Sequence, residues 1–503
     1  MTANTIATLN DATATSITAC TRATTTQSVN TEEDDLVVPF TDTTNTKKRK
    51  LDDCLASLHS PNAGSEKRDR GSPTSVVQDD DSEAEEDEEV PVWVAQYQAN
   101  DPSEDRYDYI LHLDLAPNSD VSSEKGYSLS LWAVYDGHGG TTCAEYCQNN
   151  LLPHCAVAVS NALQCTITNH DIELDRECDL QSDQEEGCQH SAVEKALKTA
   201  FQIVDETFLN DLSEHDVQTC CYKNGSWNVG ACALVTALVV PHDEDEASVL
   251  YTAHCGDCRG LLLTNDCQDG KENIIAEATR VSDSEHNGFL PVPVAEKVVQ
   301  SKYGHLRAVT QLTEDHSASN NVAEQQLVLK RTNNAHRAIT TTVNNTKRVA
   351  GSLAITRAMG DAYLKHPNLS FGLYKENWGE GPYITSTPAT SHTILSFGER
   401  TNNSNADSQD LRAMLVLGSD GIFEKISNRD ILQTVQNYIE DDAHLADNIV
   451  DRVLDNVCER LSDNSCFPVT KRTLSRLSPG RSRRSKHDDI TCMVIDLYKI
   501  CFE

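Results

Sequence analysis

The stretch Leu131-Trp-Ala-Val-Tyr-Asp136-Gly-His-Gly-Gly140 is the most informative part of this chain, because an apolar run passes directly into Asp, Gly and His. A carboxylate at the end of a buried strand is held rigidly. The glycines let backbone carbonyls approach a ligand or an ion, and the histidine can exchange a proton near neutral pH. This pattern predicts a functional site at a strand end.

Two further stretches place carboxylates beside apolar runs. Ala413-Met-Leu-Val-Leu-Gly-Ser-Asp420-Gly421 ends in Asp-Gly, and His487-Asp488-Asp489-Ile490-Thr491 precedes the run Cys492–Ile495. Taken alone, an Asp-Gly pair after a strand is more often a turn, because both residues favour turns. Three such carboxylates together suit Mg²⁺ or Mn²⁺, which prefer oxygen ligands. Their joint occurrence therefore favours a metal site.

Strand and helix patterns are grouped in blocks along the chain. Helical spacing appears at Ile431, Val435 and Tyr438, after a possible capping box at Ser427 and Asp430, and again from Leu445 to Leu461. This block arrangement predicts an α+β fold rather than a doubly wound parallel sheet. The expected strands are apolar or alternating and cover residues 107–115, 127–135, 230–240, 248–254 and 411–417.

Residues 1–90 are rich in Thr, Ser, Asn and charge and contain few large apolar side chains. Such a segment buries too little surface to offset its ordering entropy, so we expect a disordered acidic tail. Within it, the cluster Lys47-Lys48-Arg49-Lys50 fits either a nuclear import signal, bound by an import receptor, or plain solvated charge. Loops inserted into the folded part are expected at about residues 165–190, 265–305 and 470–487.

Composition narrows the class of protein. The net charge of −36 argues against a general nucleic-acid binder, because phosphate backbones would repel this surface. The longest apolar run, Ala231 to Val240, is about half of the roughly 20 residues that a membrane-spanning helix needs, so no membrane span is expected. The 18 cysteines are scattered, which favours reduced thiols and a nuclear or cytoplasmic protein. The Thr/Ala-rich start contains less arginine than a typical organelle transit peptide.

With these motifs in this order, the chain resembles the type 2C metal-dependent (PPM-type) protein serine/threonine phosphatases. The resemblance covers roughly residues 92–499. The matching motifs are Pro102-Ser-Glu104-Asp105-Arg106, Val134-Tyr-Asp136-Gly-His138-Gly-Gly140, Gly230-Ala-Cys-Ala233, His254-Cys-Gly-Asp257-Cys-Arg259, Gln311-Leu-Thr-Glu-Asp-His316, Arg348-Val-Ala-Gly-Ser-Leu-Ala-Ile-Thr-Arg357-Ala-Met-Gly-Asp361, Ser419-Asp420-Gly421 and Asp488-Asp-Ile-Thr491.

The resemblance implies a phosphatase domain over residues 91–503. It would be a four-layer αββα sandwich, in which two central antiparallel sheets are flanked by helix pairs. It also implies that phosphoserine and phosphothreonine in proteins are hydrolysed directly, without a phosphoenzyme. The attacking water would lie between two Mg²⁺ or Mn²⁺ ions, which make it more acidic.

Residue roles follow from the same resemblance. Asp136 would bridge the two metals, and His138 would be the general acid that protonates the leaving oxygen. The other implied metal-site residues are the Gly137 carbonyl on one ion, Asp420 and Asp488 on the other, Glu104 and Asp105 on metal-bound waters, and Asp257 on a third, weaker ion.

Three positions depart from the family pattern. Asn100 stands where many members have a phosphate-binding arginine, so Arg106 is considered for this role, with a strand-edge surface arginine as the equal alternative. Glu424 stands where the family often has an aspartate near the third metal, so the charge is kept on a longer side chain. Asp489 replaces the usual asparagine, and its charge would either tighten metal binding or repel phosphate.

Other features leave alternatives open. Cys255 and Cys258 form a Cys-x-x-Cys pair, but no second pair completes a zinc site, so redox or zinc chemistry is the weaker interpretation. The basic, Ser-containing stretch Lys471–Lys486 suits a kinase target or docking arm as well as a solvated loop. The rival functions are a catalytically silent scaffold that binds phosphoproteins and a nuclear interaction protein that acts through its acidic tail.

Overall fold

The structure is a computed structural model in which residue contacts divide the chain into residues 1–61 and 62–503. Every described residue belongs to the second unit. The expected acidic tail, with the cluster Lys47–Lys50, lies outside the described residues. The described residues are 91–115, 126–173, 183–219, 229–243, 246–265, 275–279, 296–297, 306–370, 374, 376, 378, 381–397, 413–439, 444–463, 465 and 467–502.

One of the two large sheets has seven antiparallel strands. Its central strands β3 (Tyr127–His138) and β4 (Gly230–Pro241) are buried along most of their length, as expected for strands covered on both faces. The strand order is β2 (Arg106–Leu115), β3, β4, β5 (Ser248–Cys255), β13 (Ala389–Ser396) and β7 (Ile275–Thr279), with β12 (Met359–Gly360) paired to β4.

The second large sheet has six strands, and all of its described pairs are antiparallel. The strand expected at residues 411–417 is part of this sheet and runs from Ala413 to Gly418, while residues 411–412 lie outside the described part of the chain. The strand order is β1 (Val92–Tyr97), β15 (Ile490–Asp496), β14 (Ala413–Gly418), β6 (Arg259–Asn265), β9 (Leu306–Gln311) and β8 (Glu296–Lys297).

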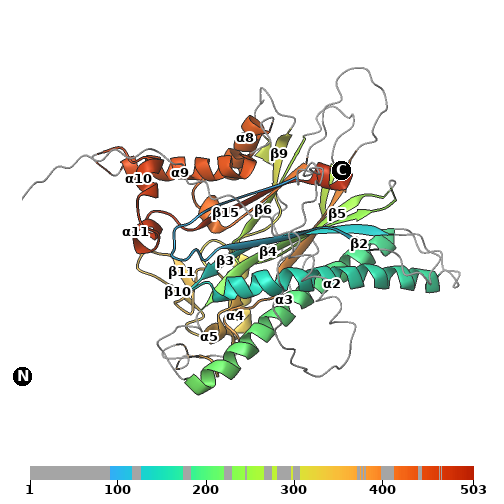
Figure 1. Cartoon of the computed structure of the whole chain (residues 1–503). Helices are drawn as coiled ribbons and strands as arrows, with labels where there is room; N and C mark the ends of the chain where they lie inside the picture. The colour runs from blue at the N-terminus through green and yellow to red at the C-terminus, as the bar shows by residue number, and fades with distance from the viewer. Residues whose placement is uncertain are drawn as a thin grey trace, which may run out of the picture. The chain divides into compact units, whose positions relative to one another are not determined.

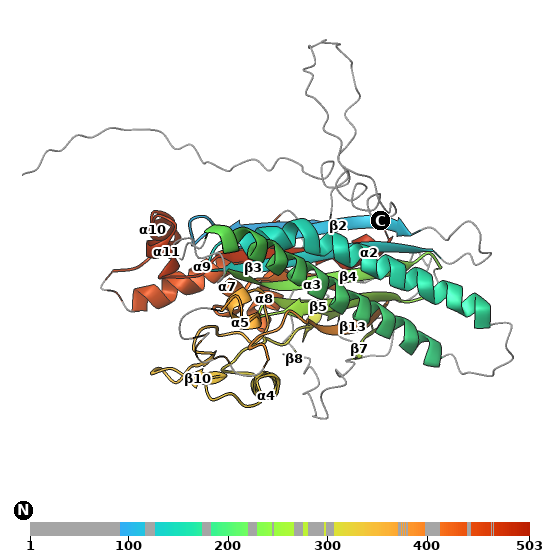
Figure 2. The ribbon, with the colours of Figure 1, turned by 90° about the horizontal axis from the view of Figure 1, so that it is seen from below.

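Helix pairs cover the outer faces of both sheets, which gives four layers (Figure 1). The long helices α2 (Thr142–Glu173) and α3 (Asp183–Thr219) lie side by side on the seven-stranded sheet (Figure 2). Helices α8 (Asn428–Tyr438) and α9 (Leu445–Asp463) cover the six-stranded sheet. Separate apolar clusters fill the space between the sheets and beneath each helix pair. The expected αββα sandwich is confirmed.

The expected capping box is present at the start of α8. The Ser427 side chain accepts from the Asp430 N–H, and the Asp430 carboxylate accepts from the Ser427 N–H. The shorter elements are α4 (Val322–Arg331), β10 (Ile339–Thr341), β11 (Lys347–Val349), α5 (Ala362–Lys365), α7 (Asp420–Phe423), α10 (Lys471–Ser475), α11 (Arg481–Arg484) and α12 (Leu497–Phe502).

Two of the expected loops contain helix. Residues 470–487 form α10 and α11, because Leu474 is buried against the core beside α9. In the stretch 165–190, α2 continues to Glu173 and α3 begins at Asp183. In the stretch 265–305, the described residues are Asn265, the last residue of β6, and the two strands β7 and β8. Among the described helices, none combines the length and apolar character needed to cross a membrane.

Candidate metal centre

The antiparallel pairing brings several strand ends to one edge of the sandwich. In the six-stranded sheet, Tyr97 at the end of β1 lies opposite Ile490 at the start of β15, and Gly418 at the end of β14 lies opposite Cys492. In the other sheet, the start of β2 lies opposite Tyr135, next to Asp136. The segments that carry the predicted carboxylates are therefore neighbours, although they lie far apart in the sequence.

Three carboxylates from these segments form a compact group. Asp136 lies near the end of β3, Asp257 lies in the connection from β5 to β6, and Asp420 is the first residue of α7. Each offers a carboxylate oxygen, and these oxygens lie within 4.8 Å of one another. The backbone N–H of Asp420 also donates to Asp136 Oδ2 at 3.3 Å. The structure thus brings together Asp136 and Asp420, as predicted, and places Asp257 in the same group.

The charges of this group favour a bound cation. Burial raises the pKa of Asp136 and that of Asp420 well above the ordinary value, and each is raised further by the neighbouring carboxylates. Asp420 Oδ1 is buried and accepts no hydrogen bond from a described residue. A buried carboxylate with a free oxygen needs a positive partner. The donor set therefore fits a hard divalent cation.

The Asp257 turn is held from both sides by His316. The Gly256 N–H donates to His316 Nδ1 at 3.0 Å, and the His316 N–H donates to the Gly256 carbonyl at 3.0 Å. The His316 ring stacks on His254, with ring centroids 4.3 Å apart. The thiol of Cys232 donates to Asp257 Oδ1 at 3.0 Å. These contacts fix the direction of the Asp257 carboxylate.

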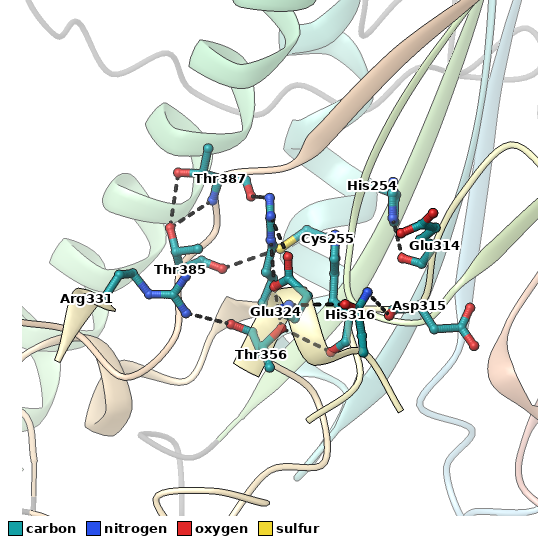
Figure 3. Close-up of polar contacts among 12 residues, drawn as sticks. His254, Cys255, Glu314, Asp315, His316, Glu324, Arg331, Thr356, Thr385 and Thr387 are labelled. Atoms are coloured by element: carbon teal, nitrogen blue, oxygen red, sulfur yellow. Dashed lines mark hydrogen bonds and ion pairs between the residues drawn. The ribbon is translucent and has the colours of Figure 1, made fainter. Parts of the chain in front are cut away.

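This turn rests on a buried polar network (Figure 3). The Thr356 N–H donates to the His316 carbonyl at 2.8 Å, and the Thr356 hydroxyl donates to Glu324 Oε2 at 2.6 Å. Glu324 forms a buried ion pair with Arg357, at 2.7 Å. His254 Nε2 donates to the Glu314 carbonyl at 2.8 Å. The network links the loop after β9 and helix α4 to the metal centre.

Asp489 organises the segment that carries Glu104 and Asp105. One of its oxygens accepts from the N–H groups of Ala99 and Asn100, at 2.5 and 2.9 Å. The other accepts from Asn100 Nδ2 and the Glu104 N–H, at 2.9 and 2.8 Å. The Asp489 carboxylate therefore accepts four hydrogen bonds from this segment, three from backbone N–H groups and one from a side-chain amide.

Glu104 and Asp105 differ in burial. Asp105 is buried and accepts from the Thr491 hydroxyl at 2.8 Å, and burial raises its pKa to about 7. Burial also raises the pKa of Glu104, which is less enclosed. Gly137 packs against this segment, because a Cβ there would lie 2.5 Å from the Glu104 carbonyl oxygen. Only glycine permits this approach.

Asp488 lies beside the three-carboxylate group but is not part of it. Its carboxylate contacts the guanidinium of Arg484, one helical turn earlier in the chain. Burial raises the pKa of Asp488 to about 6, and the Arg484 charge opposes this shift. Asp488 nevertheless raises the pKa of both Asp136 and Asp420, which places all three in one electrostatic cluster.

His138 is paired with a residue to which the sequence assigns no role. Its Nε2 lies 2.7 Å from Oδ2 of Asp361, which is fully buried and follows Gly360 in a left-handed conformation, with φ of 50°. Burial lowers the pKa of His138, but the charge and hydrogen bond of Asp361 outweigh it and raise the pKa overall. The motif that ends at Asp361 was the available signal, although Gly-Asp in a turn is common.

The residues discussed for the positions that depart from the family pattern form hydrogen bonds or ion pairs with other protein groups. Asn100 donates to Asp489, as described above. The Arg106 guanidinium donates to the carbonyls of Ser103 and Asp105, both at 2.7 Å, and pairs with Glu145 at 2.6 Å. Glu424 is more than half exposed and pairs with Lys425 at 2.8 Å, while its charge raises the pKa of Asp420.

The Cys-x-x-Cys pair lies behind the Asp257 turn. Cys255 and Cys258 are both buried and free, and burial raises the pKa of Cys255 to about 12. The Cys255 thiol lies 3.6 Å from the Thr385 carbonyl. Buried thiols of high pKa are poor nucleophiles and poor metal ligands.

The chain is similar to known proteins of one kind. It is 27% identical over 341 residues to Protein phosphatase 2C 32 of Arabidopsis thaliana, covering 61% of this chain and 35% of that protein. It is 25% identical over 365 residues to Probable protein phosphatase 2C 36 of Arabidopsis thaliana, covering 70% of this chain and 49% of that protein. The chain thus spans about a third to a half of the length of these curated relatives.

One similar solved structure is serine-threonine phosphatase 2C from Toxoplasma gondii, with a TM-score of 0.41, 14% identity and coverage of 81% of this chain and 99% of that one. The family model described as Protein phosphatase 2C matches residues 109–272 and 298–465. This match covers more than half of the 503 residues. The chain therefore belongs to the protein phosphatase 2C family.

Proposed function

We propose that this protein hydrolyses phosphoserine and phosphothreonine in other proteins, with two divalent cations, Mg²⁺ or Mn²⁺, as cofactors. The observation that carries the proposal is the meeting of Asp136, Asp257 and Asp420 at one edge of the sandwich. Family membership supports the reaction class. The basic, phosphorylated segments of protein substrates are suited to a chain with a net charge of −36.

Divalent cations bound there would polarise the phosphate and lower the pKa of a water ligand. Asp136, Asp420, Asp488 and Asp257 supply the carboxylates that would hold the cations. The backbone N–H of Glu104 is held by Asp489, and we propose that the Glu104 carboxylate holds a metal-bound water.

His138 would donate a proton from Nδ1 to the leaving serine or threonine oxygen, because Nε2 is held by Asp361. Its side chain is 27% exposed, which leaves the ring accessible from solvent, and Asp361 favours the protonated form. Because alkoxide is a poor leaving group, protonation in the transition state accelerates its departure. Asp361 therefore acts as a positioning residue for His138.

Phosphate release from phosphoserine and phosphothreonine peptides tests this function. We expect turnover with added Mn²⁺ or Mg²⁺, none with a chelator, and a loss of at least about a hundredfold in Asp136→Asn, since that variant removes a shared ligand charge. The matched control is Asp447→Asn on α9, whose carboxylate is 66% exposed. Full turnover in Asp136→Asn would contradict the assigned site, and metal and peptide binding without turnover would favour the silent scaffold.

For localisation, we infer entry into the nucleus through the cluster Lys47–Lys50, bound by an import receptor. The support is compositional: four basic residues lie within an acidic tail. Replacing all four by Ala should shift a tagged protein from the nucleus to the cytoplasm, as seen by microscopy. The same number of substitutions at Thr43, Thr44, Asn45 and Thr46 should leave the distribution unchanged.

A further inference from the structure

Helix α11, built from the basic stretch 470–487, brings an arginine to the rim of the metal centre. Arg484 is its last residue, and the guanidinium contacts the carboxylate of Asp488. The side chain of Arg484 is 48% exposed, against 19% for Asp488. Burial raises the pKa of both Asp488 and Glu104, and the nearby charge of Arg484 opposes this rise in each.

The position of α11 is fixed by its neighbour Arg483. The Arg483 guanidinium donates to the carbonyls of Gln98, Ser475 and Leu477, at 2.9, 2.8 and 2.6 Å. It also lies over the ring of Tyr97, at 5.3 Å from the centroid. These contacts join α11 to the end of β1, so the backbone of Arg484 is held beside the site.

The Gly480 N–H adds a further tie, because it donates to the Ala99 carbonyl at 2.7 Å. The helix therefore rests on the same segment that Asp489 holds on its other side. A short helix fastened at both its start and its interior is a rigid support for one projecting side chain.

Two other arginines near this edge, Arg106 and Arg259, already have carboxylate partners. Arg106 pairs with Glu145 and with two backbone carbonyls, and Arg259 makes a two-point contact with Asp315, at 3.2 and 2.7 Å. Arg484 is different, because its side chain is 48% exposed, against 21% for Arg106 and 17% for Arg259, and because its acceptor is a predicted cation ligand. A partly exposed ion pair is weak and readily exchanged.

We propose that Arg484 binds the phosphate group of the substrate, with the planar guanidinium donating two hydrogen bonds to its oxygens. This inference rests on the proposed function. In the cation-free state Arg484 neutralises Asp488, and a cation on Asp488 would take over that charge and leave the guanidinium to face the incoming dianion. A guanidinium fork matches phosphate geometry better than an ammonium group does.

Two binding measurements on the full chain test Arg484 without turnover. Calorimetry with Mg²⁺ alone should give an affinity for Arg484→Ala equal to or higher than that of the parent, because a competitor for Asp488 is removed. Calorimetry with inorganic phosphate on the Mg²⁺-loaded protein should show affinity reduced about tenfold to a hundredfold, as expected for lost charged hydrogen bonds. Arg481→Ala, an exposed position on the same helix, should leave both affinities unchanged.

Kinetics provide the second readout. In Arg484→Ala, KM for a phosphoserine peptide should rise by about the same factor as the phosphate dissociation constant, with a smaller change in kcat, while Arg484→Lys should fall between the two proteins. Equal phosphate affinity in Arg484→Ala and the parent would overturn the inference. An equal loss of phosphate affinity in Arg481→Ala would also overturn the inference, because it would indicate an effect of general surface charge. A loss of Mg²⁺ affinity in Arg484→Ala would overturn it as well, because Arg484 would then be a support for Asp488.

The inference and the proposed function fail in different ways. If the parent protein hydrolyses the peptide and Arg484→Ala is indistinguishable from it, the function stands and the phosphate site lies elsewhere. If the parent shows no turnover but binds phosphate in an Arg484-dependent manner, the phosphate site stands and the proposed hydrolysis fails. Thermal unfolding of each variant checks that the fold is retained.

Discussion

At the scale of single residues, the proposed proton donor, His138, depends on one buried carboxylate. Asp361 has no exposed surface, and Oδ2 lies 2.7 Å from His138 Nε2. Its other oxygen accepts no hydrogen bond from a described residue, so the carboxylate relies on His138 for compensation. An uncompensated buried charge is costly, and the protonated imidazole relieves that cost. The pair therefore favours the charged form of His138 that a proton donor requires.

Substitution of His138 should affect substrates according to their leaving groups. In His138→Ala, kcat for a phosphoserine peptide should fall by about a hundredfold or more, because the departing alkoxide loses its proton donor. The effect should be much smaller for p-nitrophenyl phosphate, whose leaving group needs no proton. Phosphate release from both substrates measures the difference, with exposed His444→Ala as control. Equal losses on the two substrates would assign His138 another role.

Gly230 tests the same pair from the opposite side. A Cβ at this position would overlap both His138 Nε2 and Asp361 Oδ2. Gly230→Ala should therefore separate the pair and lower peptide turnover by roughly tenfold or more, with Mg²⁺ affinity retained. Gly260→Ala is the matched control, because its nearest neighbour would lie at 3.4 Å, an ordinary contact. Unchanged turnover in Gly230→Ala would show that the contact between His138 and Asp361 is dispensable.

At the scale of elements, the segment between β1 and β2 has no regular structure of its own and is shaped by the chain before β15. Both oxygens of Asp489 are used to hold it, and Asp489 is itself buried. Both oxygens of the Asp489 carboxylate are therefore engaged by backbone and side-chain N–H groups of this segment.

Removal of the Asp489 carboxylate should loosen this segment. Asp489→Ala should lower the free energy of unfolding by about 3 kcal/mol, because several buried donors lose their acceptor. Mg²⁺ affinity should fall as well, since Glu104 is no longer positioned. Asp489→Asn retains an acceptor for Ala99 and Asn100 but loses the second acceptor, so it should lie between the parent and Asp489→Ala. Urea unfolding and calorimetry measure both effects, and an Asp489→Ala protein of parental stability would refute this role.

The elements also explain which parts of the site the sequence could predict. Asp136 and Asp420 follow apolar runs, and a run that ends in a carboxylate predicts both the strand and the position of its side chain. The capping box likewise marks the start of α8. Asp361 follows no apolar run, its local pattern is that of a turn, and its partner is 223 residues away, so the motif that ends there did not predict the contact with His138. The helices in residues 470–487 were missed because their stability comes from contacts with β1 and α9.

At the scale of the whole molecule, the metal centre is supported by a polar network that reaches well beyond it. Two neutral imidazoles, His254 and His316, are stacked within this network behind Asp257. Burial lowers the pKa of His254 to about 4 and that of His316 well below its ordinary value. His316 Nδ1 accepts from the Gly256 N–H, and His254 Nε2 donates to the Glu314 carbonyl.

Acid should therefore weaken the folded state through these rings. Their folded pKa values lie below the unfolded value of about 6.5, so the unfolded chain binds more protons as the pH falls. The stability they contribute is present above about pH 6.5 and is lost between there and about pH 4. The difference in free energy of unfolding between the parent and His254→Phe should change by a few kcal/mol over this interval. A difference independent of pH, measured by urea unfolding, would contradict this account.

The carboxylates assigned to the candidate centre come from both sheets. Asp136 lies on β3, Asp420 and Asp488 lie at the ends of β14 and β15, and Asp257 lies among the three residues that join β5 to β6. The distances between these carboxylates therefore depend on the relative position of the two sheets. Mg²⁺ requires near-ideal octahedral geometry and tolerates small errors in ligand distance poorly. Repacking of Trp132 or Leu417 in the interior between the sheets would consequently alter cation affinity from a distance. Apolar side chains that never meet a substrate would thus influence the candidate metal site through the seating of the two sheets.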